Sequence, residues 1–338
     1  MKNKLSINDI AKALQVSKTT ISFILNGKAE EKRISKDLTE RVIKFIKEND
    51  FRPNQLAKSL STGKTFTIGL MVEKISDYFF AQIAYHVEEL ANKSGYKIIY
   101  CSTENDTQKT KELIKLFAER HVDGFIITPP VGIEKEIKDL MQNDIPVVLF
   151  DRFFTDFNTS YVVMDNYEST YKAINYLITT KCANIAFIEL ESDQNQMTER
   201  KRGYVNAMNE NRLTPNILRI PFSNDKKQTI LQITSFLADN IQLDALFFAT
   251  NYLTMHGIKA IHNRGLKIPH DISIVAFDDH DFFDIYTPSI TAVAQPIQEM
   301  AQQLINILLN DISSRKRTIQ QKVVPAKLIL RDSTIRKI

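Results

Sequence analysis

The sequence predicts a small all-α head that contains a helix-turn-helix, followed by an α/β body of two lobes built on parallel sheets. Three observations predict this architecture. Apolar residues recur at helical spacing near the start of the chain, and beyond residue 65 short apolar runs alternate with amphipathic stretches. These runs are also more numerous than one compact sheet would hold, and at 338 residues the chain is too long for one ordinary core.

The first two predicted helices lie close together in the sequence. Ser6 followed by Asp9 has the spacing of a capping box, which marks the start of the first helix. One face of that helix is apolar and comprises Ile7, Ile10, Ala11 and Leu14. Ser17 is expected to cap the second helix, whose inward residues are Thr20, Ile21, Ile24 and Leu25. Because so few residues separate the two helices, they must meet at a steep angle, as in a helix-turn-helix.

The second helix is expected to face outward through Lys18, Thr19, Ser22 and Phe23. In a helix-turn-helix this helix enters the major groove of DNA. Ser35 is expected to cap a third helix, which completes a three-helix core with Leu38, Val42, Phe45 and Ile46.

Charge is distributed unevenly along the chain. Residues 1–64 hold 14 Lys+Arg and 7 Asp+Glu, a net charge of +7, whereas the whole chain carries +4 and the remainder therefore −3. A basic head on a mildly acidic body is typical of a nucleic-acid-binding module. The alternative is a small helical bundle that binds no DNA, and the charge distribution argues against it.

The head closely resembles the lactose-repressor/galactose-repressor family of bacterial transcription regulators. The matching stretches are residues 7–11, 16–17, 20–22, 25–26, Ser35 with the third helix, and 52–60, and weaker matches continue in order as far as Arg331. The resemblance implies a helix-turn-helix head, a hinge helix, and a two-lobed body like a periplasmic sugar-binding protein. It also implies a homodimer on a near-palindromic operator.

The resemblance makes residues 54–60 a hinge helix that is ordered only on DNA. Leu60 would then be an apolar wedge in the minor groove, which unstacks a base step and kinks the duplex. Its alternative role is a linker residue that packs on the body. The expected DNA contacts are Ser17, Lys18, Thr19, Thr20, Ser22, Phe23 and Asn26 in the head, and Asn54, Ala57, Lys58 and Leu60 in the hinge.

Three features of the head depart from the family pattern. Gln15 stands where the family usually has a glycine in the turn, which costs on the order of 1 kcal/mol at most if the residue is left-handed. The segment from Gly27 to Arg33 is a few residues longer than in the founding members. Phe23 stands where several members carry a base-reading arginine, and a phenyl ring can pack on a thymine methyl but cannot bind guanine in a bidentate manner.

The body is expected to alternate strands and helices. The predicted strands are 67–72, 97–102, 124–128, 147–150, 184–190, 245–250 and 272–277, and the helical stretches include 80–94, 107–120 and 168–180. Residues 298–313 and 323–330 are expected to cross back and complete each lobe. The predicted boundaries are a head at 1–53, a hinge and linker at 54–64, and a body at 65–338. Lobe 1 would hold approximately 65–160 and 292–320, and lobe 2 approximately 161–291 and 321–338.

Composition excludes several classes of protein. A hydrophobic content of 43% with 25% charged residues is typical of globular domains. The chain lacks an 18-residue apolar run, and its first residues are polar and basic, so we expect neither a membrane span nor a signal peptide. Cys101 and Cys182 lie far apart in apolar runs, which is typical of reduced core thiols in a cytoplasmic protein.

No motif in the sequence indicates catalysis or a cofactor. Gly63-Lys64-Thr65 resembles the end of a phosphate-binding loop, but Lys58 stands where that loop needs its first glycine. Nucleophile-elbow and dinucleotide-binding motifs are both absent, and the six histidines lack metal-ligand spacing. A metal at residues 278–281 stays open as a lesser possibility. We therefore expect a protein that is not an enzyme and binds no cofactor or metal.

Ligands of open parallel sheets bind at the carboxyl ends of the strands. Polar and aromatic residues collect there, as suits a polyhydroxylated ligand. The resemblance sharpens three positions: Arg200, which precedes Gly203-Tyr204, Asn251 after a strand, and Asp278 before Asp279. Tyr252 replaces an acidic residue that is common beside this asparagine. The expected effector-binding set is Phe79, Phe80, Thr128, Asp151, Arg152, Arg200, Asn251, Tyr252 and Asp278.

Each effector candidate also has a structural alternative. Arg200 could be a surface charge at the start of a helix, Asn251 and Asp278 could be helix caps, and Phe79 and Phe80 could belong to the core. The sequence thus favours a cytoplasmic transcription regulator, a repressor controlled by a small sugar-like effector. A sugar-binding module without a regulatory role on DNA is the alternative, and an enzyme is the third choice.

Overall fold

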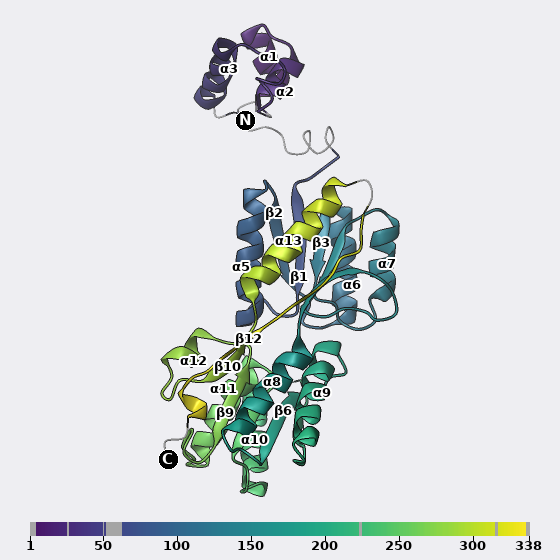
Figure 1. Cartoon of the computed structure of the whole chain (residues 1–338). Coiled ribbons are helices and arrows are strands. Elements are labelled where there is room, and N and C mark those ends of the chain that lie inside the picture. Colours follow the sequence, from purple (N-terminus) through teal and green to yellow (C-terminus); the bar gives the residue numbers. More distant parts are fainter. Residues whose placement is uncertain are drawn as a thin grey trace. The chain divides into compact units, whose positions relative to one another are not determined.

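The computed structural model describes residues 5–25, 27–49, 51, 63–222, 225–314 and 317–335. The chain divides into two compact units, Met1–Thr65 and Phe66–Ile338 (Figure 1). Helices and strands carry the labels of Figure 1. In the described part of the chain, no helix combines the length and the apolar character needed to cross a membrane.

The first unit is a bundle of three helices, α1 (Ile7–Leu14), α2 (Lys18–Leu25) and α3 (Lys36–Glu48). Its core is formed by Ile10, Ile21 and Val42, one from each helix, which are all fully buried. The three helices and their inward residues confirm the predicted helical head.

The predicted helix starts are confirmed by their hydrogen bonds. The Ser6 hydroxyl accepts from the Asp9 amide, and the Asp9 carboxylate accepts from the Ser6 amide at 2.9 Å, which completes the capping box. Ser17 accepts from the Thr20 amide at 3.0 Å, and Ser35 caps α3 by accepting from the Leu38 amide.

In the turn between α1 and α2, the backbone of Gln15 adopts a left-handed conformation. Gln15 has φ 55° and ψ 41°, and beyond it the Val16 amide donates to the Ala11 carbonyl at 3.0 Å. A residue with a Cβ is strained there by on the order of 1 kcal/mol, so the chain accepts at Gln15 the cost that a glycine would avoid.

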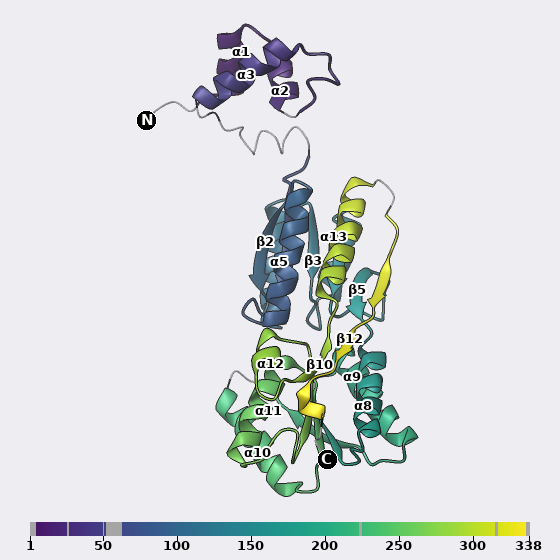
Figure 2. The same cartoon turned by 60° about the vertical axis from the view of Figure 1, so that its left-hand side comes forward.

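The second unit begins with a parallel six-stranded sheet in the order β11-β5-β4-β3-β1-β2. Its strands are β1 (Thr67–Val72), β2 (Lys97–Ser102), β3 (Gly124–Ile127), β4 (Val147–Phe150), β5 (Ser160–Met164) and β11 (Gln321–Val324). Helices α5 (Tyr78–Lys93) and α13 (Ile297–Ser313) pack on one face, and α6 (Thr107–Glu119) and α7 (Glu134–Gln142) on the other (Figures 1 and 2). Both faces are therefore apolar, which explains the continuous hydrophobic strands.

The second sheet has the order β12-β10-β9-β8-β6-β7, parallel except for β12. Its strands are β6 (Ile185–Leu190), β7 (Asn216–Ile220), β8 (Ala245–Phe248), β9 (Ser273–Phe277), β10 (Thr291–Ala294) and β12 (Lys327–Ile329). One face is covered by α8 (Asn166–Thr179) and α9 (Asn195–Glu210), and the other by α10 (Lys226–Asp239), α11 (Asn251–Asn263) and the short α12 (Asp281–Ile285). A short 3-10 turn, η1 (Asp332–Thr334), follows β12.

The chain crosses between the two lobes three times. It passes into the second lobe after β5, returns to the first after β10, and crosses again between β11 and β12. Residues 323–330, expected as one piece, are therefore split between the two sheets. The expected lobe boundaries at 160, 291 and 320 each fall a few residues early, because β5 and β11 belong to the first sheet and β10 belongs to the second.

Candidate functional site

The polar residues that follow the strands collect at the carboxyl ends of both sheets. Glu73 follows β1, Asn105 lies in the loop after β2, and Thr128 and Asp151-Arg152 follow β3 and β4. In the second lobe Asn251, Asp278 and Gln295 follow β8, β9 and β10. Hydrogen bonds from Gln194 to Asn105 and from Tyr78 to Asp281 join the two lobes, so the two carboxyl edges face each other. This is where open α/β sheets bind ligands.

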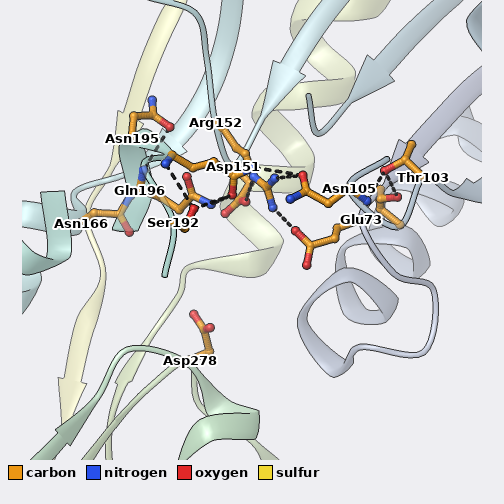
Figure 3. A network of polar contacts seen from close by, with 12 residues as sticks. Glu73, Thr103, Asn105, Asp151, Arg152, Asn166, Ser192, Asn195, Gln196 and Asp278 are labelled. Carbon is orange, nitrogen blue, oxygen red and sulfur yellow. Dashed lines mark hydrogen bonds and ion pairs between the residues drawn. The ribbon is translucent and has the colours of Figure 1, made fainter. Parts of the chain in front are cut away.

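Arg152 is the centre of the polar network in the first lobe (Figure 3). Its guanidinium donates to Glu73, to Asp151 at 3.2 Å, and to the Asn105 side-chain oxygen at 2.8 Å. Burial alone would lower the pKa of Arg152, but Glu73 and Asp151 raise it, so the arginine stays charged. The network holds the Arg152 side chain in one orientation.

Asn105 connects the two lobes. Its side-chain oxygen also accepts a hydrogen bond of 2.9 Å from the amide of Gln194, which precedes α9 in the second lobe. Gln194 in turn accepts from Gln196 at 3.2 Å. The remaining oxygen of Gln196 and the Thr128 hydroxyl are buried and lack a hydrogen-bond partner among the described residues.

Arg200 is a deeply buried charge of the second lobe, with 2% of its surface exposed. It donates to Asn166 at 2.8 Å and to the Ala249 carbonyl at 2.6 Å, and its guanidinium lies 3.5 Å from the ring centroid of Phe277. Burial lowers the pKa of Arg200, while Asp278 and Asp151 oppose that shift. The alternative of a surface charge is therefore wrong.

Gly203 allows the helix of Arg200 to approach its neighbour. A Cβ at Gly203 would lie 2.4 Å from the Tyr167 carbonyl oxygen on α8, so a larger residue would push α9 away. The Arg200-x-x-Gly203 spacing thus combines a buried guanidinium with the close helix packing that holds it in place.

Asp278 lies in the loop after β9 with φ 68°. Its carboxylate accepts from the Gln295 amide at 2.5 Å and lies 3.8 Å from the Arg200 guanidinium. Burial raises the pKa of Asp278, and Arg200 opposes this shift. Asp278 is not a helix cap, because His280 caps α12, and α11 is capped by Thr250 rather than by Asn251.

Two of the aromatic candidates, Phe79 and Phe80, are buried around Phe150. Phe79 stacks on Phe150 with ring centroids 5.6 Å apart, and Phe80 meets the same ring edge-on. Both belong to the core of the body, at the start of α5. Burial and the nearby Glu73 raise the pKa of Tyr252, so its hydroxyl stays protonated.

The loop that carries Asp278 is held by Arg331, which lies between β12 and η1. Arg331 donates two hydrogen bonds to Asp279, at 2.8 and 2.9 Å, and a third to the Ile290 carbonyl. His280 accepts from the Phe282 amide at the start of α12. Residues 278–281, the cluster considered for a metal, are thus engaged in protein contacts, and the described residues hold no group of three potential metal ligands.

In the head, the predicted DNA-contacting residues differ in exposure. Lys18 and Thr19 on α2 are exposed, whereas Ser22 and Phe23 are half-buried rather than fully outward. Ser17 and Thr20 share a hydrogen bond of 2.8 Å between their hydroxyls. Asn26, Asn54, Ala57, Lys58 and Leu60 lie outside the described residues, so the structure does not place them.

Comparison with known proteins agrees with this two-part organisation. The sequence pattern described as "Bacterial regulatory proteins, lacI family" matches residues 6–54, and the "Periplasmic binding protein-like domain" matches residues 174–334. The transcriptional regulator RegA of Clostridium saccharobutylicum is 32% identical over 98% of this chain and 99% of its own length. The chain belongs to the lacI family.

Two solved structures are similar to this lacI-family chain. A periplasmic binding protein/LacI regulator of Alkaliphilus metalliredigens, complexed with D-xylulofuranose, is 27% identical over 80% of this chain and 99% of its own, with a TM-score of 0.72. The lac repressor dimer bound to operator and an anti-inducer shares the fold across 98% of this chain and 100% of its own, with a TM-score of 0.87 at 19% identity. This lacI-family chain is a transcription regulator and not an enzyme.

Several polar residues of the site were not predicted from the sequence, among them Glu73, Gln196, Asn105, Gln194 and Gln295. Asn105, Gln194 and Gln295 each bind a predicted residue or join the two lobes, but they lie in loops and a crossover that carry no periodic pattern. Their one signal was position, because each stands within a few residues of a strand or helix end at the carboxyl edge of a sheet.

Proposed function

We propose that this chain is a repressor which binds a near-palindromic operator as a homodimer and releases or tightens it when a sugar-like effector binds between its lobes. The observation that carries this proposal is the convergence of two buried arginines and two buried carboxylates at the facing carboxyl edges. Arg152 and Asp151 come from the first lobe, and Arg200 and Asp278 from the second.

The chemistry of these groups suits a polyhydroxylated ligand. Sugar hydroxyls both donate and accept, so they match carboxylate acceptors and guanidinium donors whose orientation is already fixed. The buried oxygens of Thr128, Gln196 and Gln295 that lack a described protein partner would be further positions for hydroxyl groups. Phe79, Phe80 and Tyr252 would supply apolar surface, and Asn251 a further amide.

The bound sugar in the Alkaliphilus relative supports this class of effector. It does not determine which sugar this chain takes. Tyr252, which replaces an acidic residue common in the family, lies beside Asn251 at the start of α11 and is expected to alter selectivity.

Regulation requires only that the effector binds one arrangement of the lobes more tightly than another. Asn105–Gln194 is one bond between lobes that such a rearrangement would change. In the head, Ser17, Lys18, Thr19, Thr20, Ser22, Phe23 and Asn26 would contact the operator, with Asn54, Ala57, Lys58 and Leu60 in the hinge. Such a protein would act in the cytoplasm, on the chromosome.

The assembly is proposed to be a homodimer, as in the operator-bound lac repressor structure. Two identical heads match the two halves of a near-palindromic site. Light scattering on the full chain at micromolar concentration should give twice 38.9 kDa. A stable fourfold mass would contradict the dimer.

The decisive experiment measures DNA and sugar binding on one protein. A duplex is selected from a random library by the full chain, and its binding is followed by fluorescence anisotropy at several salt concentrations. Pentoses and hexoses are then added to find a sugar that shifts the midpoint. Selection of a palindromic sequence and a sugar-dependent shift support the proposal. Sugar binding without selective DNA binding would favour the sugar-binding module.

A further inference from the structure

The segment from Gly27 to Arg33, longer than in the founding members of the family, forms an ordered turn after α2. The Lys28 amide donates to the Phe23 carbonyl at 2.9 Å, and the Lys32 amide donates to the Lys28 carbonyl at 3.0 Å. Gly27 has φ 69°, which a glycine adopts without strain. The extra residues therefore continue the end of α2 as a turn instead of forming a free loop.

Two apolar residues anchor this turn in the head. Ala29 and Ile34 are half-buried and pack against the core of the three helices, and the Ile34 amide donates to the Ala29 carbonyl at 2.8 Å. Between these anchors the charged side chains of the turn are exposed. The direction in which the charged side chains leave the turn is thus set by the fold.

Lys32 is directed toward Phe23 of α2. Its ammonium lies 5.6 Å from the centroid of the Phe23 ring, within the range of a cation–π contact. It also forms a 2.9 Å ion pair with Glu31, and both side chains of this pair are substantially exposed. Lys32 therefore places a positive charge beside an uncharged residue of the proposed DNA-reading helix.

We infer that Lys32 is a DNA-backbone contact, which binds a phosphate of the operator beside the base that Phe23 packs against. This inference rests on the proposed function, in which α2 enters the major groove. A flexible lysine is a point charge suited to a phosphate, whereas Phe23 can meet an apolar base edge such as a thymine methyl. Lys32 would thus supply the phosphate contact that the uncharged Phe23 cannot make, while Phe23 packs on the base.

Glu31 acts against this contact. Its pKa is lowered by Lys32 and Lys28, so it is ionised at neutral pH and repels phosphate. Exposed ion pairs are weak, and the dense negative charge of DNA competes with the carboxylate for Lys32. Removing the Glu31 charge should therefore strengthen DNA binding, while removing the Lys32 charge should weaken it.

The head contains a matched control for both changes. Lys44 and Glu48 on α3 form an exposed ion pair of 3.9 Å with the same charges, but on another helix. Lys44→Gln and Glu48→Gln alter the net charge of the head by the same amounts. A difference between the two pairs thus reports the position of the charge and not its sum.

The test uses the full chain and the duplex selected by the wild-type protein, with anisotropy measured over a series of potassium chloride concentrations. Lys32→Gln should weaken binding about three- to tenfold and reduce the slope of log affinity against log salt by about two, one for each subunit of the proposed dimer. Its selected consensus should stay that of the wild type, because a phosphate contact carries no base information. Glu31→Gln should bind more tightly, and Lys32→Arg should keep the wild-type slope.

Several results would overturn this inference. They are a wild-type slope for Lys32→Gln, an equal loss for Lys44→Gln, or a changed consensus for Lys32→Gln, which would make Lys32 a base reader. Circular dichroism of each variant checks that the head stays folded, and Glu31→Gln provides a gain-of-binding readout that misfolding cannot imitate. If the wild-type protein selects no DNA sequence, the proposed function itself fails. If the wild-type protein selects a sequence but the Lys32 variants behave as the controls do, only the inference about Lys32 fails.

Discussion

The phenol hydroxyl of Tyr78 in the first lobe donates a 2.8 Å hydrogen bond to the carboxylate of Asp281 in the second. The Tyr78 ring also lies over His280, with centroids 4.2 Å apart. Burial and the bond to Asp281 raise the pKa of Tyr78 to about 12, so the hydroxyl remains a donor at neutral pH. None of these three residues belongs to the proposed effector set, so this contact joins the lobes without direct contact to the proposed ligand.

Tyr78→Phe should remove that hydrogen bond and keep the ring contact with His280. Because this bond holds the facing lobes together, effector affinity should fall by about two- to tenfold, the range expected from one net hydrogen bond. Calorimetric titration with the sugar found by the anisotropy screen measures this change. Tyr171→Phe is the control, because Tyr171 bonds to Glu210 within one lobe and its loss should leave effector affinity unchanged.

Asp77 gives the body a pH dependence of known sign. Burial, followed by the nearby Asp278, raises the pKa of Asp77 from 3.8 to about 6, and Glu73 adds to the shift. The folded protein therefore holds a proton more tightly than the unfolded chain, and the resulting stability is present below 3.8 and lost as the pH rises through about 6.

Asp77→Asn keeps the cap that Asp77 gives to the Phe79 amide but removes the charge. We expect the variant to melt at a higher temperature than the wild type at pH 7, with the difference shrinking as the pH is lowered toward 4. Thermal melts across that range provide the comparison. A difference that grows toward low pH would show that the carboxylate of Asp77 is stabilising instead.

Phe23→Arg tests the reading of bases by α2. An arginine can bind guanine in a bidentate manner, so the variant should select guanine at one position of each half-site while the head stays folded. Sequencing of duplexes selected by each protein makes the comparison. Identical consensus sequences for the two proteins would show that residue 23 does not read bases.

Leu60, outside the described residues, is proposed from the resemblance as a wedge in the minor groove. Leu60→Ala should reduce specific affinity and DNA bending, while salt-driven binding to unrelated duplexes remains. Gel mobility of duplexes with the site at the centre or the end reports bending. Normal bending, or a body that melts several degrees lower, would place Leu60 in a structural role.

The strands predicted from sequence were those with continuous apolar runs, and all of them except the edge strand β2 are largely buried. Each of the seven predicted apolar runs forms a strand, because continuous hydrophobic stretches are typical of strands inside parallel sheets. Four of the described strands were missed. β7 and β11 lie at the edges of the sheets, and three of the four residues of β11 are exposed, so neither shows a continuous apolar run. β5 and β10 lie inside the sheets and are largely buried, but they are short and include serine, threonine or alanine beside their larger apolar residues. The split of residues 323–330 between two sheets is a property of topology that composition does not reveal.

The candidate site also contains residues that sequence motifs predicted and residues that only the three-dimensional fold brings together. Arg200 and Asp278 were found through motifs, and the structure brings their charges within 3.8 Å. Asn105 and Gln194 lie 89 positions apart and meet only because the lobes face each other. In the head, the length of the Gly27 to Arg33 segment is evident from the sequence. The contact between Lys32 of that segment and the Phe23 ring depends on how the segment packs in three dimensions.

The central claim, that a ligand held by both lobes controls DNA binding, is tested most directly with Asp278→Ala. Operator affinity of the wild-type and variant proteins is measured by anisotropy with and without the sugar that shifts the wild type. The variant should bind operator normally but need about tenfold more sugar or fail to respond, because a buried carboxylate–hydroxyl bond is lost. A normal sugar response in Asp278→Ala would contradict the account and move the effector site elsewhere.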